Sequence, residues 1–256
     1  MHQSIPAPPS HLNFEAVELS PVAGSLIRGW YGQTVDAKAC VLLLHGVRSS
    51  RLEMLGRAEF LLRKGFSVLL IDFQAHGESS GEAITFGYLE SANVDVAAAF
   101  IRSRTPDIPL IALGFSLGGA AAVLSASAQE FDGMILEAVY PTIEKAVANR
   151  LRIRFGTMGG WLTPMLSRQL YWRLRVTPDR LSPLEAISRV TCPVLIIGGI
   201  EDQRTRQEDT KTLFNAVSGP KELWLIPGVA HENFHHAVSE EYEQRILAFL
   251  QRVLAT

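Results

Sequence analysis

The sequence predicts an α/β fold with a mostly parallel central sheet and helices on both faces. The first observation is a series of short, nearly continuous apolar runs, which suit strands buried on both faces: residues 41–44, 67–71, 109–113, 133–136, 193–197 and 221–226. The second is a set of segments with helical spacing between these runs: residues 51–63, 88–102, 117–126 and 207–217. Strands that alternate with helices favour a parallel sheet covered on both sides.

The two ends of the chain depart from this alternation. Residues 13–19 and 26–32 have no helical segment between them, so we expect an antiparallel hairpin at one edge of the sheet. Residues 240–254 have the pattern of an amphipathic closing helix. Since α/β chains of 256 residues often form one unit with one large core, we expect a single domain over residues 1–256.

One interval is too long for a simple crossover. Residues 141–182 separate two predicted core strands, and we expect them to form a helical cap insertion. Its large apolar residues could face a pocket or pack on the body of the domain: Trp161, Leu162, Met165, Leu166, Leu170, Tyr171 and Trp172.

The same interval is rich in arginine, and Asp179 is the only acid between residues 150 and 180. The arginines are Arg150, Arg152, Arg154, Arg168, Arg173, Arg175 and Arg180. Such a stretch can receive an anionic group of a substrate, touch a membrane surface or a partner, or form a solvated face. The sequence leaves these alternatives open.

The composition is that of a packed globular protein, with 47% hydrophobic and 20% charged residues. Because 24 Lys and Arg stand against 26 Asp and Glu, no overall field attracts nucleic acid, and we expect no nucleic-acid partner. Cys40 and Cys192 each begin an apolar run and indicate two separate buried thiols. Without a leader pattern or an 18-residue apolar run, we expect a cytoplasmic protein with no integral membrane segment.

A candidate nucleophile lies in the motif Gly114-Phe115-Ser116-Leu117-Gly118, directly after a predicted strand and directly before a predicted helix. A nucleophile elbow needs a tight turn at this place, with glycines where side chains would come too close to neighbouring elements. The alternative is a serine that only caps the helix. The position between strand and helix favours the nucleophile.

From these residues the chain resembles the α/β-hydrolase family over nearly its whole length, in a branch with a serine nucleophile and a short cap. In that family the acid and then the histidine follow later strands. The runs PVLIIGGIED and ELWLIPGVAH supply Asp202 and His231 at these places. The resemblance thus implies a catalytic triad of Ser116, Asp202 and His231.

Each triad position has rivals in the sequence. Glu201 is the rival acid, and the rival bases are His45, His76, His235 and His236. His45 and His76 precede the serine and fall in other family motifs, so we expect His45 to support its loop. The segment DFQAHGESSG resembles a structural turn of the family, with Ala75 in place of the common glycine and Asp72 as a hydrogen-bonding turn residue.

The chemistry requires these residue types because a serine hydroxyl is a poor nucleophile until a neutral imidazole takes its proton, and a carboxylate must fix the imidazole tautomer. The segment LLLHGVRSSR resembles the family's oxyanion loop. On that resemblance the backbone N–H groups of Val47 and Leu117 bind the oxyanion. We expect hydrolysis of a carboxylic ester in a small acyl substrate, without a metal or organic cofactor.

Three alternatives stay open. The same triad serves thioesterases and serine peptidases. The segment His231-Glu232-Asn233-Phe234-His235 matches H-E-x-x-H, which on a helix binds zinc in metallopeptidases. Finally, the fold can serve as a binding protein without catalysis. Oligomeric state is not predicted.

Overall fold

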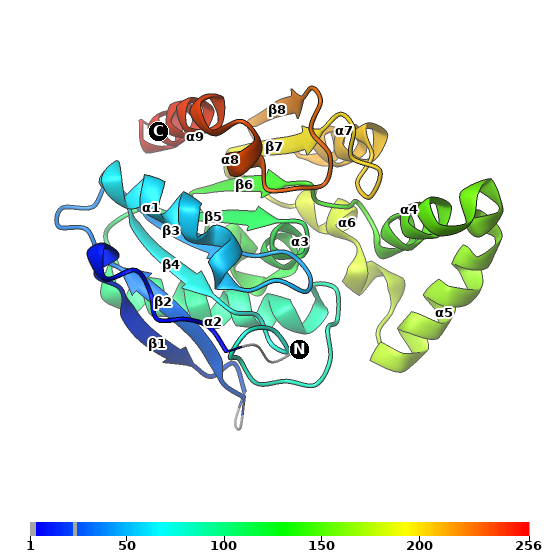
Figure 1. Cartoon of the computed structure of the whole chain (residues 1–256), viewed down its shortest axis with the longest axis horizontal. Helices are drawn as coiled ribbons and strands as arrows, with labels where there is room; N and C mark the ends of the chain where they lie inside the picture. The colour runs from blue at the N-terminus through cyan, green and yellow to red at the C-terminus, as the bar shows by residue number, and fades with distance from the viewer. Residues whose placement is uncertain (1–3, 23–24, 256) are drawn as a thin grey trace.

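The predicted α/β architecture is confirmed by the computed structural model, which describes residues 4–22 and 25–255 (Figure 1). Eight strands form one sheet in the order β1-β2-β4-β3-β5-β6-β7-β8. The strands are β1 (Glu15–Leu19), β2 (Ile27–Gly32), β3 (Cys40–Leu44), β4 (Ser67–Ile71), β5 (Leu110–Phe115), β6 (Gly133–Glu137), β7 (Val194–Gly199) and β8 (Lys221–Ile226). Six of them run parallel, from β4 through β3 to β8. β1 and β2 pair antiparallel at one edge, as predicted.

Helices cover both faces of the sheet (Figure 1). The α-helices are α1 (Leu55–Arg63), α2 (Tyr88–Arg104), α3 (Leu117–Leu124), α4 (Ile143–Phe155), α5 (Thr163–Leu174), α6 (Pro183–Ile187), α7 (Gln207–Ala216), α8 (Phe234–Ala237) and α9 (Ser239–Leu254). Short 3₁₀ helices are η1 (Ser10–Leu12), η2 (Arg51–Met54), η3 (Ala126–Gln129), η4 (Gly156–Leu162) and η5 (Pro178–Leu181). Two apolar clusters, one on each face of the sheet, form the core. In residues 4–22 and 25–255, no helix is both long enough and apolar enough to span a bilayer.

The central strands are buried along their whole length, because helices pack on both of their faces. Every residue of β3, β4, β5, β6 and β7 is buried. Their apolar runs lack the alternation of a strand with one solvated face, which is why the sequence predicted a covered parallel sheet. Because the six strands are parallel, the loops after their carboxyl ends gather at one rim of the sheet.

The interval between β6 and β7 folds into helices that stand beside the sheet. α4 and α5 form an antiparallel pair joined by η4, and in Figure 1 this junction is the part of the pair farthest from the sheet. We call residues 143–174 the α4–α5 hairpin. It occupies most of the interval 141–182 where the sequence predicted a helical insertion.

The two thiols are unpaired, as predicted, but only one is fully buried. Burial raises the pKa of the Cys40 thiol on β3 to about 12. Cys192 lies before β7 and is half-buried, so the prediction of burial was too strong for it. Position 192 is the end of a loop, where packing is less complete than inside the strand.

Candidate active site

Ser116 stands at a sharp turn between β5, which ends at Phe115, and α3, which begins at Leu117. Its backbone has φ 50° and ψ −106°, a conformation that a non-glycine residue adopts only under strain. The Ser116 N–H donates to the carbonyl oxygen of Glu137 on β6 at 2.7 Å and so helps to hold the turn. The tight strand-to-helix turn expected at this motif is therefore present.

The glycines around Ser116 let the turn pack against its neighbours. A Cβ added at Gly118 would lie 2.2 Å from the carbonyl oxygen of Leu44 on β3. One added at Gly114 would lie 2.4 Å from the backbone nitrogen of Gly119. Both distances are shorter than atoms tolerate, so these positions exclude any side chain.

A carboxylate and an imidazole meet at the same rim. Asp202 follows β7, His231 follows β8, and His231 Nδ1 lies 2.7 Å from Asp202 Oδ2. The other carboxylate oxygen accepts the N–H groups of Arg204 at 2.7 Å and Thr205 at 2.8 Å. Because a carboxylate oxygen only accepts, the proton of the neutral His231 imidazole belongs on Nδ1 and Nε2 is the acceptor. Glu201, the rival acid, is exposed and makes no side-chain contact of this kind in the described chain.

The nucleophile candidate lies close to this pair but is not yet joined to it. The ring of Phe115, the residue before Ser116, packs on the His231 imidazole with centroids 5.2 Å apart. Within the described residues, Ser116 Oγ makes no hydrogen bond to His231, and Ser116 is only 2% exposed. The sequence brought the three groups to one rim, and the structure joins two of them by a hydrogen bond.

The loop after β3 holds Val47, one of the two residues whose N–H groups the family resemblance assigns to the oxyanion. The Gly46 N–H donates to the Glu53 carboxylate at 2.6 Å, and the Arg48 N–H donates to His76 Nε2 at 3.0 Å. Between them the Val47 N–H has no hydrogen-bond partner within residues 4–22 and 25–255. The resemblance implies Val47 as an oxyanion donor, and the His76 contact engages the neighbouring Arg48 N–H.

Two of the rival histidines are structural. His45 Nδ1 donates to the carbonyl of Gly46 at 2.7 Å, and its Nε2 accepts the Phe73 N–H at 3.1 Å. Burial lowers the pKa of His45 to about 3, so the ring stays neutral. Burial also lowers the pKa of His76, whose Nδ1 donates to the carbonyl of Gln74 at 2.8 Å. The expectation that His45 supports its loop is confirmed, and His76 does the same.

The H-E-x-x-H segment does not form the helical pair that a zinc site needs. α8 begins at Phe234, so His231 lies in the loop before the helix that carries His235. His235 Nε2 contacts Glu243 of α9 at 3.3 Å, and its ring packs on Tyr242. In the part of the chain that the structure describes, no three His, Cys, Asp or Glu side chains are grouped to hold a metal ion.

The turn after β4 matches its predicted structural role. Asp72 accepts the N–H groups of Arg51 at 2.7 Å and Glu78 at 3.0 Å, and its carboxylate pairs with the Arg51 guanidinium at 2.5 Å. Ala75 has φ 58°, the conformation for which the family's usual glycine is suited. Asp72 is committed to the turn and is not a second catalytic acid.

Sequence reasoning missed a buried ionic network beneath the rim. The Arg57 guanidinium of α1 pairs with the Glu137 carboxylate at the end of β6 at 2.5 Å, and the Tyr242 hydroxyl of α9 also donates to Glu137. Burial lowers the pKa of Arg57, but the Glu137 charge opposes burial and the net shift is upward. The available signal was Arg57 itself, a cation among the buried positions of an otherwise apolar helix face.

Arg150 on α4 lies within electrostatic reach of the candidate site. Burial lowers the pKa of Arg150 on α4, and the charges of Arg204 and Arg48 add to this effect while Tyr140 and Asp202 oppose it. The guanidinium of Arg150 is therefore within the electrostatic reach of Asp202 and of two other arginines.

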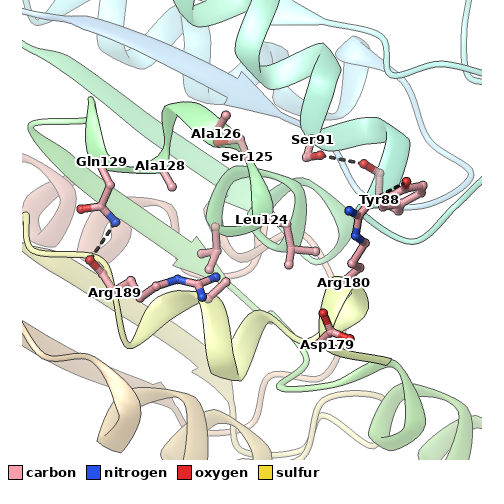
Figure 2. Close-up of a pocket in the computed structure, with 12 residues that line it drawn as sticks. Tyr88, Ser91, Leu124, Ser125, Ala126, Ala128, Gln129, Asp179, Arg180 and Arg189 are labelled. Carbon is pink, nitrogen blue, oxygen red and sulfur yellow. Dashed lines mark hydrogen bonds between the residues drawn. The ribbon is translucent and has the colours of Figure 1, made fainter. Parts of the chain in front are cut away.

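A separate hollow of about 610 Å³ lies at the far end of α3 (Figure 2). Figure 2 shows Arg180 donating to the Tyr88 hydroxyl and Gln129 donating to the carbonyl of Arg189. Because α3 has eight residues, Leu124 on this wall is about 12 Å along the helix from Ser116. This hollow is distinct from the rim that carries His231.

Comparisons with known proteins identify a family and several relatives. The model of the family described as serine aminopeptidase S33 matches residues 35–186. Uncharacterized protein YqkD of Bacillus subtilis strain 168 is 27% identical over 236 residues, covering 89% of this chain and 76% of that protein. Uncharacterized protein YfhR of Escherichia coli K12 is 22% identical over 255 residues, covering 96% and 84%.

Among solved structures, the Pyrococcus furiosus esterase Pf2001 superposes with a TM-score of 0.79 at 23% sequence identity, and the match covers 98% of each chain. At this identity the likeness establishes a common fold.

Proposed function

We propose that this chain, which belongs to the serine aminopeptidase S33 family of α/β hydrolases, cleaves carboxylic esters through an acyl-enzyme on Ser116. The observation that carries the proposal is the His231–Asp202 hydrogen bond at the rim where the strained turn places Ser116. The ester preference draws on the fold likeness to the Pyrococcus furiosus esterase.

In the proposed reaction His231 acts first as a base and then as an acid. Ser116 Oγ attacks the acyl carbon while His231 Nε2 takes the hydroxyl proton, and Asp202 stabilises the imidazolium that forms. The imidazolium gives the proton to the leaving alcohol, and the C–O bond breaks. Water then attacks the acyl-enzyme with His231 again as base, and Ser116 is regenerated as the acid leaves.

The contact between Ser116 and His231 has to close during this cycle. Hydrogen bonds of catalytic groups are often long in free enzymes and tighten only in the complex with substrate. The developing oxyanion is bound by the N–H groups of Val47 and Leu117. Leu117 is the first residue of α3, and the first N–H groups of a helix have no partner within the helix.

The charges around the site favour an ester over an aminopeptidase substrate. An aminopeptidase must bind the ammonium group of a peptide N-terminus close to the scissile bond. Here the guanidinium of Arg150 lies within electrostatic reach of Arg48 and Arg204, and the Asp202 carboxylate, which it also reaches, is committed to His231. Like charges repel, so a free ammonium group is disfavoured beside this triad. A thioester remains open, since it carries no such charge requirement.

We propose that residues 1–256 form one domain in which residues 141–182 act as the cap. Asn149 of α4 supports this arrangement, because its amide donates to the carbonyl of Arg204 at 3.1 Å and to Asp209 at 2.6 Å. These contacts join the insertion to the loop that carries Asp202. A change in α4 can therefore reach the acid of the proposed triad.

Replacement of Ser116 tests the proposal directly. With p-nitrophenyl butyrate as substrate, Ser116→Ala should lower kcat by about 10⁴-fold to 10⁶-fold, because the nucleophile is lost while substrate binding remains. Ser125→Ala, at the other end of α3, is the matched control and should retain activity. Thermal unfolding of both variants verifies that they are folded.

Two reagents separate the alternatives. A serine-directed phosphonate should inactivate the enzyme and a chelator should not, whereas the opposite result would point to the metallopeptidase. An aminoacyl p-nitroanilide turned over faster than the ester would replace the esterase with an aminopeptidase. Full activity of Ser116→Ala would remove Ser116 from the mechanism, and absence of activity on esters, thioesters and amides would favour a binding protein.

A further inference from the structure

The α4–α5 hairpin exposes large apolar side chains that nothing in the described chain covers. Eleven large apolar residues are exposed in residues 4–22 and 25–255, and seven of them lie between residues 153 and 172. They are Ile153, Phe155, Met158, Trp161, Leu162, Met165 and Trp172. Trp161 is 90% exposed and Trp172 is 80% exposed. Large apolar residues that are exposed together usually mark an interaction surface.

The same hairpin carries unpaired positive charge. Arg152, Arg154, Arg168 and Arg173 of the hairpin, and Arg175 directly after it, are all exposed, and none of them forms an ion pair within the residues that the structure describes. The one acid of the hairpin, Glu144, accepts a hydrogen bond from Tyr171. The hairpin is therefore strongly cationic, although the whole chain has a formal net charge of −2.

Part of this charge surrounds a shallow hollow beside α5. Arg168, Arg173 and Arg175 line it together with Tyr171 and Trp172, and its volume is about 670 Å³. Guanidinium groups bind phosphate oxygens in pairs, and they also stack on aromatic rings. A phosphate-bearing headgroup suits such a lining.

We propose that the α4–α5 hairpin docks the protein on the surface of an anionic phospholipid bilayer. The tip at η4, with Met158 and Trp161, lies farthest from the sheet and can enter the interface first (Figure 1). Tryptophan is favoured at the level of lipid headgroups, and arginine extends its charged end toward phosphates. The combination of an apolar tip with arginines on the helices behind it fits an interfacial helix pair.

The charges argue against a second copy of the chain as the occupant. If two hairpins packed face to face, five unpaired arginines of each would approach five of the other, and like charges without acids between them destabilise the contact. An anionic bilayer instead neutralises each of these arginines. Each basic residue near such a surface strengthens binding by about fivefold.

Vesicle binding tests the proposal with the full chain. Vesicles of phosphatidylcholine with about one third phosphatidylserine should sediment the protein, and pure phosphatidylcholine vesicles should sediment it at least tenfold less strongly. Tryptophan emission should shift to the blue on binding, because Trp161 and Trp172 leave water. Trp30 and Trp224 are 3% and 5% exposed and contribute a constant background.

Two sets of variants locate the contact. Trp161→Ala should weaken binding by about tenfold or more, and the triple variant Arg168→Gln, Arg173→Gln, Arg175→Gln should weaken it by about a hundredfold. Val35→Ala and Arg189→Gln are the matched controls, since both residues are exposed but lie outside the hairpin. Both controls should bind like the parent chain.

We expect vesicle binding to be independent of catalysis, so Ser116→Ala should bind vesicles like the parent chain. Equal binding to neutral and anionic vesicles, or binding unaffected by the arginine variants, would overturn the anionic surface. No binding to either vesicle would overturn the proposal. If in that case the chain sedimented as a dimer that Trp161→Ala dissociates, a second copy would be the occupant instead.

Discussion

The rim of the sheet and the α4–α5 hairpin use the same residue type in opposite ways. At the rim, Gly118 is required, because a Cβ there would lie 2.2 Å from the Leu44 carbonyl oxygen. In the hairpin, a Cβ at Gly160 would meet no atom within 4 Å. Position 118 has no room for a side chain, whereas position 160 faces space that the described residues do not fill, although the neighbouring Gly159 is packed 2.4 Å from the Leu151 carbonyl oxygen by the same measure.

Charged residues show the same difference. Beneath the rim, the carboxylate of Glu137 is fully buried and bound by Arg57 and Tyr242. In the hairpin, arginines such as Arg154 and Arg173 are exposed and without an ion pair in the described residues. The rim is determined by contacts within the chain, and the hairpin presents groups suited to contacts outside it.

The largest expected difference between the two regions concerns their carboxylates. Glu137→Gln should lower the free energy of unfolding by about 3–5 kcal/mol, because it leaves the buried Arg57 cation without a counter-charge. Glu144→Gln in the hairpin should cost about 1 kcal/mol or less, since Tyr171 can still donate to the amide oxygen. Urea unfolding of both variants measures the difference.

A double variant sharpens this result. Arg57→Met with Glu137→Gln removes both charges and should recover part of the stability that Glu137→Gln loses. Equal losses for Glu137→Gln and Glu144→Gln would show that the buried pair does not distinguish the rim from the hairpin.

The next effect comes from the two glycines. Gly118→Ala should lower stability by about 3 kcal/mol and reduce esterase activity, because β3 and α3 must move apart next to Val47 and Ser116. Gly160→Ala has no positive φ and no neighbour to meet, so its stability should change by about 0.5 kcal/mol or less. Denaturant midpoints and kcat/KM of both variants test this pair. A tolerated Gly118→Ala would mean that α3 is not held tightly against β3.

Much of the fold could be predicted because its signals are local. The apolar runs of the buried strands, such as the one at β7, stand between helical segments along the chain. The edge hairpin of β1 and β2 was predicted from the missing helix between them. The division of the α4–α5 hairpin into α4, η4 and α5 was not predicted. Few side chains of these helices pack on the core, and no apolar periodicity marks where each helix begins and ends.

The candidate site also has features that the sequence predicts and features that it does not. The motif around Ser116 and the strand ends before Asp202 and His231 are visible in the sequence, and so is the order of the three groups. The pairing of Glu137 with Arg57 joins residues 80 positions apart in the chain. No local pattern records such a partner, nor the contact of His76 that engages the Arg48 N–H.

The smallest of the three effects is the pH dependence of the free energy of unfolding. It should come from the rim, since the α4–α5 hairpin at residues 143–174 contains no histidine. His45 is buried at the rim with its pKa lowered to about 3, while its pKa in the unfolded chain is about 6.5. Between these values the unfolded state binds the proton and the folded state does not, so stability falls as the pH drops. From about pH 7.5 to about pH 5 this costs about 2 kcal/mol. Urea unfolding at both pH values should show that loss in the parent chain and a correspondingly smaller one in His45→Gln, and equal losses would show that His45 is not the proton acceptor.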